Sequence, residues 1–229
     1  MNAVTNVVQD AVPDVVANEV QAAETRPTLM TWARAAADLM RRWELKPHDG
    51  YLASESVLAL QGYDVAPQAH WDRRFELHLD DARLPWTPRE EESEVIEPPA
   101  DVRPLTPDVD APLHLYSTRK YSLPVTFLKP LELEQGEIHI IAPRGIARFY
   151  TVDVIQLIAQ KRAPTPEEEA FLRRGSARLA VFADYDWPRR DRWFAKFSTE
   201  LITIRDNILA GSPPRPSQME KFGRRFSVV

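Results

Sequence analysis

The residue types best suited to chemistry gather in the segment 184–191, Asp-Tyr-Asp-Trp-Pro-Arg-Arg-Asp. Its three carboxylates could hold a magnesium ion, and Arg189 or Arg190 could face a phosphate. The segment is predicted to lie between a strand and a helix, a common place for ligand sites in α/β structures. We therefore take Asp184 and Asp186 as candidate catalytic residues. The alternative is structural, because Asp186 would also make a good N-cap for the helix that follows.

A second candidate site combines hydroxyls, aromatic rings and cations in the segment 116–121, Tyr-Ser-Thr-Arg-Lys-Tyr. Arg119 and Lys120 could bind a phosphate or single-stranded nucleic acid there. The segment is equally typical of a solvated loop between two strands. Arg144 and Arg148 flank a predicted hairpin and would extend the same basic face if the strand register allows it. These four cations are the candidate nucleic-acid or phosphate-binding residues.

The end of the chain is basic and aromatic. Phe222 and Phe226 stand four residues apart, with Arg224 and Arg225 between them. A short helix would place both rings on one face, which could dock in a groove of a partner protein. We take these four residues as the candidate partner-docking set. A disordered basic end is the alternative.

Histidines and glutamates give weaker patterns. His114 and His139 lie in predicted strands and could meet across a sheet as ligands or as an acid–base pair, although strand histidines satisfied by neighbours are commoner. None of the five histidines has HxxxH or HExxH spacing. Glu132, Glu134 and Glu137 surround a turn without a lysine that would complete a nuclease-like set. We expect no metal site and no cofactor.

Composition limits the class of protein. The 229 residues include no cysteine, which excludes disulfides, thiolate metal sites and a thiol nucleophile. The seven glycines are scattered singly among twenty prolines, so no phosphate-cradling loop of the Walker or dinucleotide type can be assembled. A net charge of −5 disfavours a dedicated nucleic-acid binder. No apolar run approaches a membrane span and the N-terminus lacks a basic signal region, so we expect a cytoplasmic protein.

Periodicity predicts the elements that must position these residues. A stripe of apolar residues predicts a helix over 28–44, and Gly62 should end a shorter helix over 54–61. The stretch 68–80 fits both a helix and a strand, and we expect a helix followed by a strand there. Alternating β-branched residues predict strands after residue 112, with Pro143-Arg144-Gly145 turning a hairpin. Thr165 to Glu168 form a capping box. The predicted elements of the second half are strands 113–117, 122–128, 137–141, 146–150 and 178–183, and helices 151–160, 166–175 and 188–210.

These elements predict an α+β protein with a mixed or antiparallel sheet, packed helices, a helical N-terminal segment and disordered termini. Residues 85–112 hold seven prolines among many acids, which is typical of an extended, solvated linker. The predicted parts are a disordered tail (1–27), a helical segment (28–84), the acidic linker (85–112), an α+β domain (113–211) and a basic proline-rich tail (212–229).

In organisation, the half after the linker resembles the plasmid fertility-inhibition proteins of the Osa and FiwA type, over at most residues 113–210. That resemblance implies a fold of the ParB/sulfiredoxin type and action on a conjugation coupling ATPase or on transferred DNA. The ParB-type GERR box is absent, and the nearest text is Pro143-Arg144-Gly145-Ile146-Ala147-Arg148. The sulfiredoxin cysteine is also missing, so no catalytic residue is carried over.

Our leading hypothesis is a regulatory or inhibitory interaction protein of a bacterial mobile element, acting by protein–protein contact, with a transfer-system ATPase as the candidate partner. The flexible acidic and basic-aromatic segments and the lack of a strong catalytic signature motivate it. The first alternative is a phosphate-handling enzyme, a nuclease or ATPase centred on Asp184, Asp186 and Arg144. The second is a nucleic-acid-binding protein.

Overall fold

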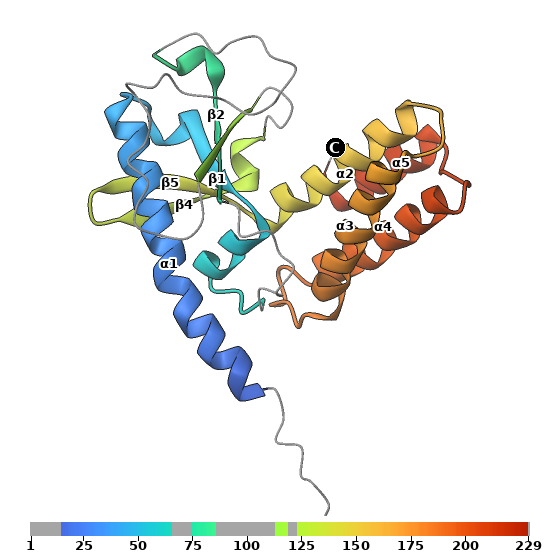
Figure 1. Cartoon of the computed structure of the whole chain (residues 1–229), viewed down its shortest axis with the longest axis horizontal. Helices are drawn as coiled ribbons and strands as arrows, with labels where there is room; N and C mark the ends of the chain where they lie inside the picture. The colour runs from blue at the N-terminus through green and yellow to red at the C-terminus, as the bar shows by residue number, and fades with distance from the viewer. Residues whose placement is uncertain (1–14, 66–74, 86–112, 119–122, 229) are drawn as a thin grey trace, which may run out of the picture.

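The computed structural model describes residues 15–65, 75–85, 113–118 and 123–228. A long helix, α1 (Val15–Arg42), lies along a sheet, and four further helices gather into a bundle beside it (Figure 1). The bundle consists of α2 (Pro143–Ala159), α3 (Pro166–Asp184), α4 (Trp193–Leu209) and α5 (Pro216–Phe226). The predicted α+β class is confirmed.

The strands of the described residues form one mixed sheet in the order β3-β2-β1-β5-β4. β1 pairs antiparallel with β2 and parallel with β5, β2 pairs parallel with β3, and β4 and β5 form an antiparallel hairpin. Parallel pairing between β1 and β5 places their carboxyl ends at the same edge. The bounds are β1 (Gly50–Ala53), β2 (Phe75–Leu79), β3 (Leu113–Ser117), β4 (Leu128–Leu133) and β5 (Gly136–Ile141).

This sheet corrects the predicted partition of the chain. The segment 28–84, expected to be helical apart from a strand at the end of 68–80, supplies both β1 and β2, and β1 is the central strand. Residues on both sides of the predicted linker 85–112 therefore build one core. The linker itself lies outside the described residues, apart from Pro85. β1 was not predicted, because its four residues, Gly-Tyr-Leu-Ala, are all buried and too few to show an alternation of apolar and polar side chains.

Strand register separates the sheet into an aliphatic row and an aromatic row. Leu52 pairs with Leu77 and Ile140, and all three are buried. One residue away, Tyr51 pairs with His78 and His139, and the Tyr51 and His78 rings stack 5.1 Å apart. His114 and His139 do not meet across the sheet, because β2 and β1 lie between their strands, so the less favoured of the two interpretations is excluded. That separation is about 14 Å at the usual strand spacing.

The first helix is longer than predicted. α1 begins at Val15, so residues 15–27, expected in a tail, are helical, and residues 1–14 lie outside the described part. The predicted apolar stripe from Leu29 to Trp43 is buried. Gly62 ends a 3-10 helix over Glu55–Gln61 with a left-handed φ of 82°, as its position predicted. The other 3-10 turns are Pro47–Asp49, Asp81–Arg83 and Val125–Phe127.

Two strands predicted in the second half are helical. Pro143 opens α2 instead of turning a hairpin, because proline suits the first helical position. Ile146, Tyr150 and Val154 are buried at a spacing of four, which is a helical period. The segment 178–183 is the end of α3, which continues through Gly175. The predicted strand 122–128 is instead a 3-10 turn followed by β4, with residue 122 outside the described part.

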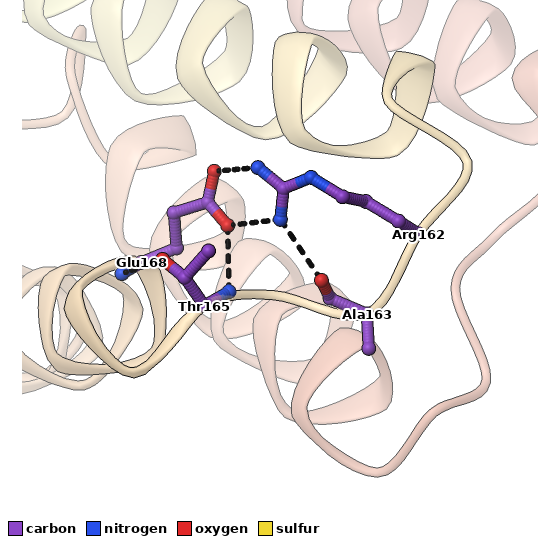
Figure 2. Close-up of polar contacts among 4 residues, drawn as sticks. All are labelled: Arg162, Ala163, Thr165 and Glu168. Carbon is purple, nitrogen blue, oxygen red and sulfur yellow. Dashed lines mark hydrogen bonds and ion pairs between the residues drawn. The ribbon is translucent and has the colours of Figure 1, made fainter.

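The junction between α2 and α3 confirms the predicted capping box. The backbone N–H of Glu168 donates to Thr165 Oγ1, and the Thr165 N–H donates to Glu168 Oε2 at 2.7 Å (Figure 2). Arg162 donates from both terminal nitrogens to the same carboxylate, at 2.7 and 2.8 Å. Its Nη1 also donates to the Ala163 carbonyl. Arg162 and the Thr165 N–H together lower the pKa of Glu168 to about 2.

The C-terminal segment, expected as a tail over 212–229, carries helix α5. Phe222 and Phe226 of α5 pack on Phe197 of α4, with ring centroids 5.4 Å from that ring in each case. α4 begins at Trp193, five residues after the predicted start, and its N-cap is Arg192. Within the described parts of the chain, every helix is too short or too polar to cross a lipid bilayer.

Candidate functional site

The acids predicted to do catalysis do not form a site. Asp184 and Asp186 are both exposed, at the end of α3 and in the turn after it. Asp186 is not a helix cap, because α4 begins later. Asp191 instead accepts hydrogen bonds from Tyr63 Oη at 2.7 Å and Arg190 Nε at 3.0 Å. Among the described residues, no three acids or histidines lie where they could share a metal ion.

The hydrogen bond between Asp191 and Tyr63 connects the segment 184–191 to the N-terminal part of the chain. Burial and the neighbouring Asp191 carboxylate raise the pKa of Tyr63 to about 12, so its hydroxyl stays a donor. Lys129 Nζ lies 3.4 Å from that hydroxyl, and burial lowers the lysine pKa. Trp187 packs beside the Tyr63 ring with only 2% of its surface exposed. Its indole nitrogen donates a hydrogen bond to the Phe182 carbonyl. The segment 184–191 is therefore mainly a structural junction.

The predicted basic face is only partly described. Arg119 and Lys120 lie outside the described residues. Arg144 is exposed in the first turn of α2, where its guanidinium lies over the rings of Phe127 and Trp193, 6.0 and 5.6 Å from their centroids. Arg148 donates to the Val228 carbonyl at 3.1 Å. Arg148 thus holds the C-terminal segment in place.

The predicted docking set is also used inside the chain. Phe222 and Phe226 are buried, so neither ring is available to a partner in this structure. Arg224 pairs with Glu220 on the same helix, and Arg225 pairs with Glu200 of α4. The prediction of an exposed docking segment is wrong, because the i, i+4 aromatic pair faces the chain's own helical bundle.

Among the described residues, a cavity of about 320 Å³ is a candidate site. It opens at the end of β1, beside the carboxyl end of the parallel strand β5, where α/β structures commonly bind ligands. α2 and α3 form its other walls. Its lining residues are Ser54, Glu55, Glu76, Ile141, Ile146, Phe149, Tyr150, Asp153, Phe171, Arg174, Gly175 and Arg178.

One acid in the cavity is held from two helices. Glu55 accepts a hydrogen bond from the Tyr150 hydroxyl of α2 and lies 3.4 Å from Arg178 Nη1 of α3. Burial and the Glu55 charge raise the pKa of Tyr150 well above its ordinary value, so the phenol stays protonated. The contacts of Glu55 link the end of β1 to both helices and fix the shape of the cavity.

A buried arginine lies directly behind the cavity wall. Arg205 of α4 is 0% exposed, and a Cβ added to Gly175 would lie 1.6 Å from its Nη1. Its guanidinium carbon lies 4.9 Å from the centroid of the Tyr150 ring and 5.8 Å from that of Phe171. Gly175 is therefore required for space, and the guanidinium sits against three residues that line the cavity.

Arg205 is poorly satisfied for a buried cation. Its Nη1 donates to the Leu172 carbonyl at 3.3 Å, while Nε and Nη2 have no hydrogen-bond partner among the described residues. Burial lowers its pKa, although the charges of Asp153 and Glu55 act in the opposite direction. A guanidinium nevertheless stays protonated in proteins. The cavity wall therefore carries a fixed positive charge.

Ser54 adds backbone strain at the same site. It follows β1 with φ 134° and ψ 161°, a conformation that side-chain-bearing residues rarely adopt. Its Oγ is buried without a hydrogen-bond partner in the described part of the molecule. Non-glycine residues in such conformations cost about 1–3 kcal/mol and cluster at functional sites. The end of β1 therefore combines backbone strain with an unused hydroxyl at the cavity.

This cavity was not predicted from the sequence. Phe171, Arg174 and Arg178 are spaced three and four apart, which would place them on one face of a continuous helix. That signal was lost because Gly175 was interpreted as a helix end and Arg178 was assigned to a strand. The partner Arg205 belonged to a correctly predicted helix, but nothing in its local sequence indicates burial.

Comparisons with known proteins add no assignment. No family model, curated protein or solved structure matches this chain.

Proposed function

We propose that the protein is a regulatory or inhibitory interaction protein that contacts its partner through the face of α3 at the mouth of the cavity. The observation that carries the proposal is Phe171, which lies on this face with 39% of its surface exposed. Arg174, one turn further along α3, is exposed beside it. Exposed aromatic residues and arginines together are typical of the residues that contribute most to protein–protein binding.

The proposed partner is a transfer-system ATPase of a conjugative plasmid or integrative element. This class is the one implied by the resemblance to fertility-inhibition proteins, and it places the action in the cytoplasm of a bacterium. Such an inhibitor needs a surface for contact and no chemical step. A concave site with an aromatic rim suits that task.

The test is conjugative transfer from donor cells that express the protein. Wild type should lower the transfer frequency of a co-resident plasmid and bind its purified coupling ATPase. Phe171→Ala should weaken that binding about tenfold or more, as expected for an aromatic residue central to an interface. Arg173→Ala is the matched control, because Arg173 is exposed on the same helix but does not line the cavity. Unchanged transfer with wild type, or equal loss in both variants, contradicts the proposal.

The same assay addresses the enzyme hypothesis. The double variant Asp184→Ala/Asp186→Ala should keep full inhibition under this proposal, since both side chains are exposed and lie outside the cavity. Thermal melting checks that the variant is folded. Loss of a magnesium-dependent activity together with loss of inhibition would favour the phosphate-handling enzyme instead.

A further inference from the structure

We infer that the cavity binds an oxyanion, a carboxylate or a phosphate group, with Arg174 and Arg178 as its direct cationic contacts and Arg205 as a fixed charge in the wall. The inference rests on the proposed function in one respect, namely that this cavity belongs to the interaction surface. Ligand binding to the purified protein nevertheless tests it separately.

The first step is the buried charge of Arg205. Its guanidinium is fully buried, has two nitrogens without partners, and forms no ion pair within 4.0 Å among the described residues. Burying a cation without a direct partner is unfavourable, and Glu55 and Asp153 offset part of this cost at longer range. Gly175, Tyr150 and Phe171 lie beside the guanidinium and also line the cavity, so the field of Arg205 acts on whatever the cavity holds.

The second step is that the lining acids have interactions of their own within the fold. Glu55 is held by Tyr150 and Arg178, and Glu76 Oε2 lies 3.3 Å from His78 Nε2. Asp153 interacts electrostatically with Arg205. Arg174, in contrast, forms no ion pair within the part of the chain that the structure describes. Arg174 is therefore the lining charge that a ligand can reach without breaking an ion pair of the described residues.

The third step is the geometry of donors. Arg174 and Arg178 are one turn apart on α3 and both line the cavity, so their planar guanidinium groups can meet one ligand. Arginine suits carboxylate and phosphate groups because its donors form a fork that matches two oxygens. The Ser54 hydroxyl, buried and without a partner among the described residues, can add a neutral donor at the inner end.

Calorimetric titration of the purified full chain tests the inference, with inorganic phosphate and succinate as separate probes. We expect saturable binding of at least one probe. Arg174→Gln should weaken it about tenfold or more, because hydrogen bonds to charged groups are worth that much. Arg173→Gln should leave it unchanged. Both sites are exposed, and thermal melting confirms that each variant is folded.

The titration results identify the ligand class or overturn the inference. Binding of phosphate alone identifies a phosphate group as the ligand, and binding of succinate alone identifies a carboxylate, such as an acidic side chain of the partner. No binding of either probe, equal binding by wild type and Arg174→Gln, or binding of magnesium ions in place of anions overturns the inference. If anions bind normally but transfer is never inhibited, the proposed function fails and the inference stands. If Phe171→Ala abolishes inhibition and no anion binds, the proposed function stands and the inference of an anion site fails.

Discussion

The start and the middle of α3 are built in opposite ways. At its N-terminus, Arg162, Thr165 and Glu168 satisfy one another through hydrogen bonds between residues at most six positions apart (Figure 2). At its middle, Gly175 makes room for Arg205, thirty positions away in the sequence, whose guanidinium keeps two nitrogens without partners in the described structure. The polar groups at the N-terminus of α3 are near the surface and have hydrogen-bond partners, whereas the Arg205 guanidinium is buried and lacks two of its partners among the described residues.

That difference separates stabilising features from functional ones. Networks with every partner in place make a structure rigid, while a buried polar group without a partner costs free energy that packing elsewhere must offset. Such costs are found where a site is prepared for a ligand. We therefore expect the stability of the bundle to come from its aromatic packing, and the exposed polar contacts to contribute least.

The largest expected effect follows from that packing. Phe222→Ala should lower the free energy of unfolding by about 3–5 kcal/mol, because a buried ring in contact with Phe197 and Phe226 is lost. Denaturation in urea measures it. Lys221→Ala is the matched control, since Lys221 is an exposed neighbour on α5. Unchanged stability together with lost partner binding would instead revive the hypothesis that the α5 rings dock on a partner.

The sequence predicted those elements whose signals are local. The capping box at Thr165, the buried stripe of α1 and the stop at Gly62 each depend on residues within one or two helical turns. The start of α2 was missed because Pro143 is compatible with a turn and with a first helical position. The central strand β1 was missed because four buried residues have no period. Its identity depends on pairing with β2 and β5, which only the folded chain provides.

The candidate site was harder to predict than the fold. Its residues come from the end of β1, from α2 and from α3, and Arg205 lies behind them on α4. Asp184 and Asp186 were chosen as candidate catalytic residues because acids cluster in that part of the sequence, but both are exposed at the surface. Burial of Arg205 depends on the absence of a side chain at Gly175, a relation that no local pattern contains.

We expect a loss of stability of intermediate size from a substitution at Gly175. In an exposed helix, Gly→Ala would stabilise by about 1 kcal/mol, because glycine has the larger backbone entropy. Here the new Cβ would overlap the Arg205 guanidinium. We expect Gly175→Ala to destabilise by about 1–3 kcal/mol, as other overpacked cores do. Differential scanning calorimetry or urea denaturation measures the change.

The double variant sharpens that prediction. In an Arg205→Met background the guanidinium is gone, so Gly175→Ala should no longer destabilise the protein. The two substitutions should therefore be strongly non-additive, as expected for residues in direct contact. Additive effects would show that Gly175 is needed for a reason other than space for Arg205.

The smallest effect is expected at the satisfied end of α3, and it depends on pH. Glu168 has its pKa lowered from 4.5 to about 2, mainly by Arg162 and the Thr165 N–H. A lowered pKa stabilises the folded state above pH 4.5, and that contribution is lost as the pH falls toward 2. Glu168→Gln should therefore lower the melting temperature modestly at pH 7 and converge with wild type near pH 2. Glu167→Gln, an exposed neighbour in the first turn, should show no comparable difference at either pH. A constant gap between wild type and Glu168→Gln across this range would mean that the carboxylate acts through packing rather than charge.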